Sequence, residues 1–483
     1  PRPEYPPHPQ LLMSELLWQL IESRRPPKSI GGKDTSSGVT YKRIEHPKNP
    51  NNKIGVMIPE IHSPNKELVE ILRHKFDSPL DQNDEALKAS VSVLFKNLQG
   101  VAPPKAQSYA VLPLNAATAL MQDKYGVTGK SGPVDFAKII ETINVIGGGE
   151  ASAGKLLLDS YLNLTDQEGL QWFEEMTEAM LAEELQSCLI QLKSSPIVPA
   201  LQHSMPEWLR GESTPFSWFA KVWPLLMNQR WKSRMPRRRW TDWCTCVLRT
   251  AIGMSYLYEM NFYFRLTEAL LNTEQQPEDE AKRILASGGS LLKWNSDLSI
   301  SSRDLNQQLK ICCARGRACR EMLQSFCLQE EPCPIPRDYC ESEQGLINWI
   351  RKMRGWVDKN SERDSLRSCM SGLENRKNNM HETIKYSLLG REQSSEEPDF
   401  YSLLKKPGKR YTIVEPGPEW FVVISSLEVP DNADSCRIDD IVGALDALGI
   451  EAGNKTLINE LERVGLARSS HDADGAIEVA AAF

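Results

Sequence analysis

Apolar residues recur every three or four positions over most of the chain between residues 114 and 390, a spacing that predicts helices. The expected helices are 116–122, 134–145, 153–162, 167–192, 246–271, 280–286, 302–328, 343–358 and 364–389. The helix at 246–271 is the most continuously apolar and is expected to be the central buried one. Residues 114–390 are therefore predicted to form a helical core domain.

The N-terminal part has a mixed pattern. Residues 1–10 are rich in proline and predict an extended arm, and 11–23 predict a helix whose apolar face packs on the core. The polar, turn-rich segment 28–52 predicts a loop, whereas 53–58 and 109–112 are strand-like and 65–76 and 83–98 helical. Residues 1–113 are thus predicted to be a mixed α/β region.

After a polar linker at 391–399, residues 400–483 change in character. A strand-like segment at 410–414 precedes expected helices at 418–427, 438–448 and 454–464, and then a hairpin formed by 466–469 and 476–480. Asn454 can cap the third helix, and Gly465 can end it. This order of elements resembles that of a winged-helix domain. The predicted fold is mainly α and multi-domain, with a small mixed N-terminal part and a C-terminal winged-helix-like module.

Composition narrows the class of protein. Of the 483 residues, 40% are hydrophobic and 25% charged, as in a folded globular protein, and the net charge of −7 excludes a generally basic nucleic-acid binder. Arg249, Glu259 and Arg265 interrupt the most apolar segment, so it is expected to be a buried helix and not a membrane span, which needs about 20 apolar residues. An odd number of cysteines, eleven, and a polar start without a secretory leader favour reduced thiols and a cytoplasmic location.

The strongest local signal is a basic strip just before the apolar helix. It holds six cations and two tryptophans: Arg230, Trp231, Lys232, Arg234, Arg237, Arg238, Arg239 and Trp240. Cations neutralise phosphates and tryptophans can stack on bases, so the strip predicts a contact with DNA or RNA. The alternative is a solvated face whose cations pair with acidic surface elsewhere on the protein.

A glycine-rich segment matches the spacing of a phosphate-binding loop. Gly149, Gly154 and Lys155 stand at the required positions. Leu156, however, occupies the place of the Ser or Thr that holds Mg²⁺, and the residues before the loop have helical spacing. A turn between two helices is therefore favoured, and no nucleotide cofactor is expected.

Six cysteines lie between Cys312 and Cys340 without any Cys-x-x-Cys pair. Their spacing in the expected helix is that of small core residues, although Cys333 and Cys340, in a proline-bearing loop, could join a distant pair of ligands. No metal is expected. The fragment Glu280-Ala281-Lys282 resembles part of a nuclease site, but the acidic residues before it indicate the start of a helix.

Charge also separates the last segment from the rest. Residues 396–483 hold seventeen acidic and eight basic residues, a net charge of −9. Such a module is expected to repel DNA and to bind a basic protein surface. The function predicted is that of a non-catalytic accessory subunit in a hetero-oligomeric, nucleic-acid-handling complex, similar in style to subunits of bacterial DNA-processing or phage-defence systems. The alternative is an enzyme, either a nuclease or a degenerate phosphate-loop NTPase.

Overall fold

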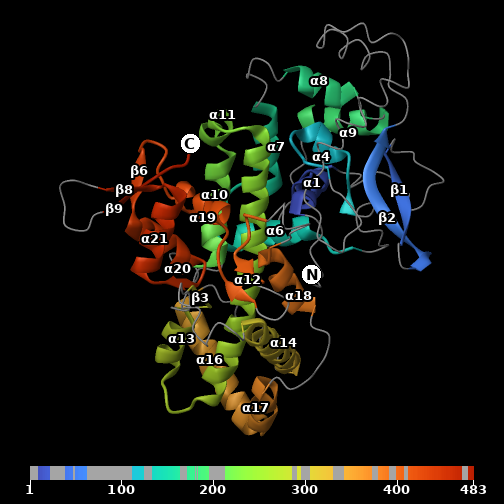
Figure 1. Ribbon diagram of the computed structural model, residues 1–483. Coiled ribbons are helices and arrows are strands. Elements are labelled where there is room, and N and C mark those ends of the chain that lie inside the picture. Colours follow the sequence, from blue (N-terminus) through green and yellow to red (C-terminus); the bar gives the residue numbers. More distant parts are fainter. Residues whose placement is uncertain are drawn as a thin grey trace, which may run out of the picture.

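The computed structural model describes residues 9–21, 39–46, 49–61, 111–124, 133–163, 171–179, 181, 183–194, 213–285, 291–294, 305–329, 342–371, 379–390, 399–406, 412–469 and 477–483. These residues are mainly helical, as the apolar periodicity predicts. A single long helix, α12 (Arg237–Leu271), runs through the centre, and the other elements are arranged around it (Figure 1). The helix spans 35 residues and is buried along most of its length.

A layer of helices covers one side of α12. It comprises α1 (Pro9–Gln19), α4 (Ala116–Leu120), α6 (Phe136–Ile146), α7 (Ala153–Leu162), α8 (Gln171–Ala179), α9 (Glu183–Ser194) and α10 (Pro215–Met227). Helix α1 is buried on nearly all sides, and the indole of Trp18 donates a hydrogen bond to the carbonyl of Gln122. The expectation that the 11–23 helix packs on the protein's own core is confirmed. Beside this layer, β1 (Val39–His46) and β2 (Asn49–Ile61) form an antiparallel hairpin.

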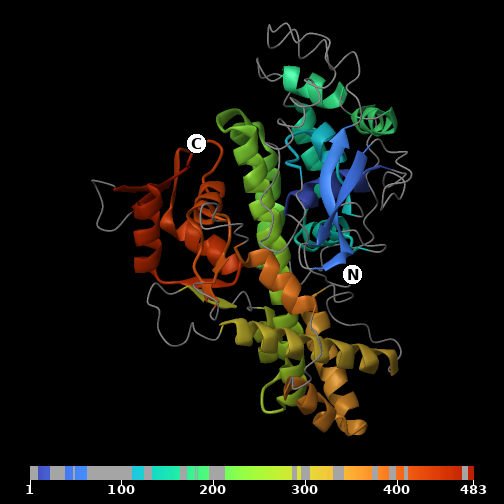
Figure 2. The same ribbon diagram turned by 45° about the vertical axis from the view of Figure 1, so that its right-hand side comes forward.

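The far end of α12 carries a second group of helices, seen at the bottom of Figure 2. It consists of α13 (Pro277–Leu285), α14 (Leu305–Gln329), α16 (Glu343–Lys359) and α17 (Arg363–Ser371). Helices α12 and α14 approach closely, since a Cβ at Gly316 would lie 2.3 Å from the carbonyl oxygen of Met260. The guanidinium of Arg354 donates to the carbonyls of Ala269 and Asn272 at the end of α12, which satisfies acceptors that a helix C-terminus leaves unpaired.

The C-terminal segment lies on the opposite side of α12 from α1, α4, α8 and α9 (Figure 2), and it also packs against α10. It contains α19 (Pro418–Leu427), α20 (Ile438–Ala447) and α21 (Asn454–Val464). A sheet of β6 (Ser435–Arg437), β9 (Ile477–Ala480) and β8 (Ala467–Ser469) has the strand order β6-β9-β8 and is antiparallel throughout. One small parallel pairing attaches the segment to the rest of the chain, that of β3 (Leu292–Trp294) with β7 (Ile450–Ala452). Strand β4 (Leu404–Lys405) pairs with β5 (Ile413–Val414) within the segment itself.

Several expected boundaries differ from those in the structure. The central helix begins at Arg237 and not near residue 246, because the strip itself is helical. The segment 28–52 is not simply a loop, since β1 and the start of β2 fall within it; the β-branched and aromatic run Val39-Thr40-Tyr41 favours extended backbone. Asn454 does not cap α21, whose N-cap is Gly453, whereas Gly465 ends that helix in the left-handed conformation with φ 76°.

Two expected helices are each divided in the structure, and other expected elements lie outside the described residues. The helices expected at 167–192 and 364–389 are each represented by two shorter helices, α8 and α9 in the first and α17 and α18 (Asn379–Leu388) in the second. The helices expected at 65–76 and 83–98 fall outside the described ranges, as do the arm at 1–8 and most of the linker. Within the part of the chain that the structure describes, no helix has both the length and the apolar character to cross a membrane.

Candidate nucleic-acid interface at the start of helix α12

The two tryptophans of the basic strip are interior residues. Trp231, on α11 (Gln229–Arg234), and Trp240, in the first turns of α12, are each 1% exposed. Trp231 packs on Trp243 with ring centroids 5.3 Å apart, and the indole of Trp240 donates to the carbonyl of Leu226 at 3.0 Å. Helical spacing turns the tryptophans inward because they have the most apolar area to bury. Neither therefore offers a face on which bases could stack, and this corrects the role expected for them.

Two of the six cations are also buried. The ammonium of Lys232 donates to the carbonyl of Ser160 at 2.9 Å, and burial lowers its pKa to about 8. Arg237 forms an ion pair with Glu174 of α8. These two side chains hold the start of α12 against the first helical layer, so they are structural and are not available to phosphate.

Arg230 and Arg239 bind the acidic C-terminal segment of the same chain. Arg230 donates to the carbonyls of Pro430 at 2.6 Å and Ala433 at 3.2 Å, and lies over the ring of Trp231. Arg239 forms an ion pair with Glu419 at 3.0 Å. Part of the strip thus pairs with acidic surface elsewhere on the protein, the alternative that the sequence left open, and this contact fixes the C-terminal segment against α12.

Arg234 donates to the carbonyl of Phe483 at 3.3 Å but its side chain is exposed, as is that of Arg238, and Arg239 is partly exposed. They surround the first turn of α12, where there is neither an acidic residue nor a side-chain cap. The N-terminus of a helix carries a partial positive charge and unpaired amide groups. Arg239 is paired with Glu419, and the exposed Arg234 and Arg238 add further positive charge there, which favours an anion. This arrangement has the properties of an anion-binding site.

A carboxyl group lies directly behind these arginines. Asp242 is on the next turn of α12, and burial raises its pKa to about 7 even though Arg238 and Arg239 favour the charged form. The side chain therefore gains a proton near neutral pH. The net charge of the start of α12 rises as the pH falls.

Stability is expected to depend on pH through Asp242. Its pKa in the folded protein is about 7, above the ordinary value of 3.8, so the folded state holds the extra proton between these pH values. The contribution of this group to the free energy of unfolding therefore falls as the pH rises from about 4 to about 7. Urea unfolding of Asp242→Asn should show a stability gain over the wild type that grows from pH 5 to about pH 7 and then levels off. The exposed Asp364→Asn serves as the control, and an equal gain in both variants would contradict this assignment.

The glycine-rich segment forms a turn between α6 and α7, as expected. The buried carboxylate of Glu141 accepts hydrogen bonds from the Ser152 hydroxyl at 2.6 Å and from the amides of Ala153 and Gly154 at 3.0 and 2.9 Å. A protein carboxylate thus occupies the position where a phosphate would bind the start of α7. Lys155 forms an ion pair with Asp159 one turn later.

The glycines of this loop also have a structural explanation. A Cβ at Gly154 would lie 2.7 Å from the backbone oxygen of Leu16, and one at Gly149 would collide with the side chain of Asn144. Gly154 therefore allows α7 to pack closely on α1. Close packing of α7 on α1 accounts for Gly154, and the nearby Asn144 side chain accounts for Gly149.

The described cysteines behave as core residues. Cys313 and Cys319 of α14 are fully buried, and burial raises the pKa of the Cys319 thiol to about 11. Cys333 and Cys340 lie outside the described residues. Among the residues that the structure does describe, no group of three or more His, Cys, Asp or Glu side chains is placed to hold a metal ion.

The fragment that resembled part of a nuclease site is structural. Glu280 lies in the first turn of α13 and is 0% exposed. Its carboxylate accepts from the amide of Asn272 at 2.9 Å and from Arg283 at 2.8 Å. These bonds join α13 to the end of α12.

One buried contact near this region was not predicted from the sequence. Arg249 of α12 donates to the carbonyls of Ser387 and Leu389, each at 3.0 Å, and pairs with Asp399 at 2.9 Å. The sequence pattern places Asp399 at the end of the predicted linker. The one signal in the sequence was an arginine within an otherwise apolar stretch, since such a charge needs a buried partner.

Comparison with known families, curated proteins and solved structures identifies no similar protein. No family model matches the chain, and neither the curated proteins nor the solved structures include one with significant similarity to it.

Proposed function

We propose that this chain is a non-catalytic scaffold subunit of a nucleic-acid-handling assembly. The observation that carries the proposal is the start of α12, where exposed Arg234 and Arg238 and half-exposed Arg239 surround a helix N-terminus with no acidic first-turn residue and no side-chain cap. Phosphate is the anion that this arrangement suits best, because cations, helix amides and the helix dipole all favour it.

The contact is proposed to be with the nucleic-acid backbone and not with bases. Arginines on the surface can neutralise phosphates of any sequence, whereas base recognition needs side chains that reach base edges or stack on base faces. The tryptophans that would have stacked are buried. Binding should therefore be weakly selective for sequence and strongly dependent on salt.

We further propose that the C-terminal segment is a winged-helix module that binds protein. The order of its helices and strands and the sheet order β6-β9-β8 support a winged-helix fold. The net charge of −9 on residues 396–483 supports binding to protein and not to DNA. Helix α21, which would enter a DNA groove, offers Lys455 and Arg463 against Glu460 and Glu462, and Arg463 is paired with Glu460. A basic protein surface is the proposed partner; a place in phage defence stays a prediction from the sequence.

The proposed phosphate contact is tested by removing its two exposed arginines. The double variant Arg234→Ala/Arg238→Ala should bind duplex or single-stranded nucleic acid more weakly, and the slope of log K against log salt should fall by about two units. Fluorescence anisotropy across a salt series measures both quantities.

A matched control makes the test specific. Arg351→Ala/Arg367→Ala changes the charge equally at exposed positions on α16 and α17, far along the chain from the strip. This variant should bind like the wild type. Equal losses in the two double variants, or binding by the wild type that does not respond to salt, would contradict the proposed site.

A further inference from the structure

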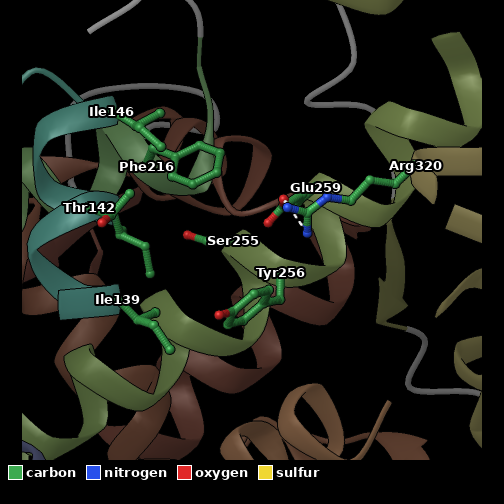
Figure 3. Close-up of a pocket in the computed structure, with 9 residues that line it drawn as sticks. Ile139, Thr142, Ile146, Phe216, Ser255, Tyr256, Glu259 and Arg320 are labelled. Carbon is green, nitrogen blue, oxygen red and sulfur yellow. Dashed lines mark ion pairs between the residues drawn. The ribbon is translucent and has the colours of Figure 1, made fainter. Parts of the chain in front are cut away.

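A half-open pocket lies between α6, α10, α12 and α14, and its volume is about 60 Å³. Its apolar wall consists of Ile139, Ile143 and Ile146, which follow one face of α6, together with Phe216 of α10 (Figure 3). Phe216 is held in place by an edge-on contact with Tyr258, with ring centroids 5.6 Å apart. The packing of the four helices thus leaves a cavity with a preformed apolar wall.

The opposite wall is polar and comes from the central helix. Ser255 is 2% exposed, and its hydroxyl points into the pocket, as Figure 3 shows. Among the described residues this hydroxyl has no hydrogen-bond partner. A buried polar group is normally paired, so an unpaired hydroxyl facing a cavity indicates that a ligand atom completes the site.

One helical turn further along α12, Glu259 faces Arg320 of α14. The two side chains form an ion pair with their nearest oxygen and nitrogen 3.6 Å apart (Figure 3), and the Nε of Arg320 is buried without an acceptor among the described residues. The polar wall therefore offers a carboxylate and a guanidinium side by side, with no net charge. Arg320 and Thr142 are the partly exposed lining residues, so the mouth lies on their side.

Size and charge together define the class of ligand. At roughly 10–15 Å³ for each water-sized group, the pocket encloses about four to six non-hydrogen atoms, which is the size of a short branched side chain. A wall of zero net charge that presents both signs suits a zwitterion, because each charged group of the ligand meets its opposite. A simple carboxylate would face Glu259, and a simple amine would face Arg320.

We propose that this pocket encloses the branched side chain of a small aliphatic α-amino acid, valine or leucine, and that the charged head group lies at the open mouth. The side chain lies against the isoleucines and Phe216. The ligand carboxylate accepts from the Ser255 hydroxyl and from Arg320, and the ligand ammonium donates to Glu259. This site is separate from the arginines at the start of α12 and does not depend on the function proposed for them.

Isothermal titration calorimetry of the full chain with L-leucine and L-valine tests the proposal. Isovalerate is L-valine without the ammonium group, isoamylamine is L-leucine without the carboxylate, and glycine lacks the aliphatic side chain. Isovalerate should bind at least about tenfold more weakly than L-valine, and isoamylamine and glycine at least about tenfold more weakly than L-leucine, since one of the three contacts is missing. No heat of binding with leucine or valine at millimolar concentration, or equal binding of isovalerate, would overturn the assignment.

Two variants separate ligand binding from folding. Ser255→Ala should weaken leucine binding about tenfold while the urea midpoint stays unchanged or rises, because the hydroxyl that it removes has no partner in the folded protein. Ile143→Phe should fill the pocket and abolish binding. Ser368→Ala, at an exposed serine of α17, is the control and should bind like the wild type. Unchanged leucine binding in both Ser255→Ala and Ile143→Phe would show that the ligand binds elsewhere.

Discussion

Replacing Arg249 by methionine is expected to lower the free energy of unfolding by about 3–5 kcal/mol, the range for breaking a buried ion pair. The guanidinium is buried and makes three hydrogen bonds, to Ser387, Leu389 and Asp399. Methionine fills a similar volume but removes the cation that pairs with Asp399 and the donor to the two carbonyls. The loss should be measured by urea or guanidinium denaturation.

The size of this effect follows from where Arg249 lies. Its side chain is 7% exposed and that of Asp399 is 8% exposed, so water can replace few of the lost bonds. The two carbonyls belong to the C-terminal end of α18, whose dipole also favours a cation. Arg249 thus ties together the central helix, α18 and the start of the C-terminal segment.

The control for Arg249 is an arginine in a surface pair. Arg317 is 47% exposed and pairs with Glu321 one turn along α14. Arg317→Met should cost less than about 1 kcal/mol, because exposed pairs contribute little. A loss below 1 kcal/mol in Arg249→Met would contradict the assignment of a structural joint. The double variant Arg249→Met/Asp399→Leu should recover part of the loss, since it removes the stranded charge as well.

Replacing Glu141 by alanine should lower the free energy of unfolding by about 3 kcal/mol. Its carboxylate accepts from one hydroxyl and two amides at the start of α7, and hydrogen bonds to a charged group contribute about 1.5–3 kcal/mol each without being additive. The removal also leaves the amides of Ala153 and Gly154 buried without an acceptor. Chemical denaturation measures the loss.

A second glutamate of the same turn provides the matched control. Glu150 is exposed, and Glu150→Ala removes the same charge a few residues away from the start of α7. Its effect should stay within about 0.5 kcal/mol, as for most surface substitutions. If Glu141→Ala were no more harmful than Glu150→Ala, the carboxylate would not be the group that stabilises the helix start.

The Glu141 result also bears on the glycine-rich loop. Spacing alone placed Gly149, Gly154 and Lys155 where a phosphate-binding loop has them, and only Leu156 argued against a nucleotide. The structure adds a positive reason: a carboxylate from α6 already takes the amides that a phosphate would need. Helices α6 and α7 meet in this way because both also pack on α1.

Local pattern determined much of the fold. The spacing of apolar residues predicted the start of α7 at Ala153 and its end at Leu162, and it predicted α19 and α21 with the same bounds as in the structure. It also indicated that the segment after residue 246 is buried. These features depend on interactions between residues three or four positions apart, which the sequence displays directly.

The partners of the cations in the basic strip could not be predicted from the local sequence pattern. Arg230, Lys232, Arg237 and Arg239 look equivalent in the sequence, yet the structure directs each of them to a different partner and leaves Arg234 and Arg238 exposed. The partners of these four side chains lie between 63 and 203 positions away along the chain. The direction of a long side chain depends on which distant surface faces it, so the charge run alone does not separate a buried cation from an exposed one.

The sequence by itself therefore determined the helical class, most helix positions, the location of the basic strip and the acidity of the last segment. Only the tertiary structure decided that the tryptophans of the strip are core residues, that Glu141 occupies the start of α7, and that Ser255 faces a cavity. The reason is physical. Backbone hydrogen bonding and amphipathic spacing are set by near neighbours, whereas burial, ion pairing and cavities arise where helices remote in sequence pack together.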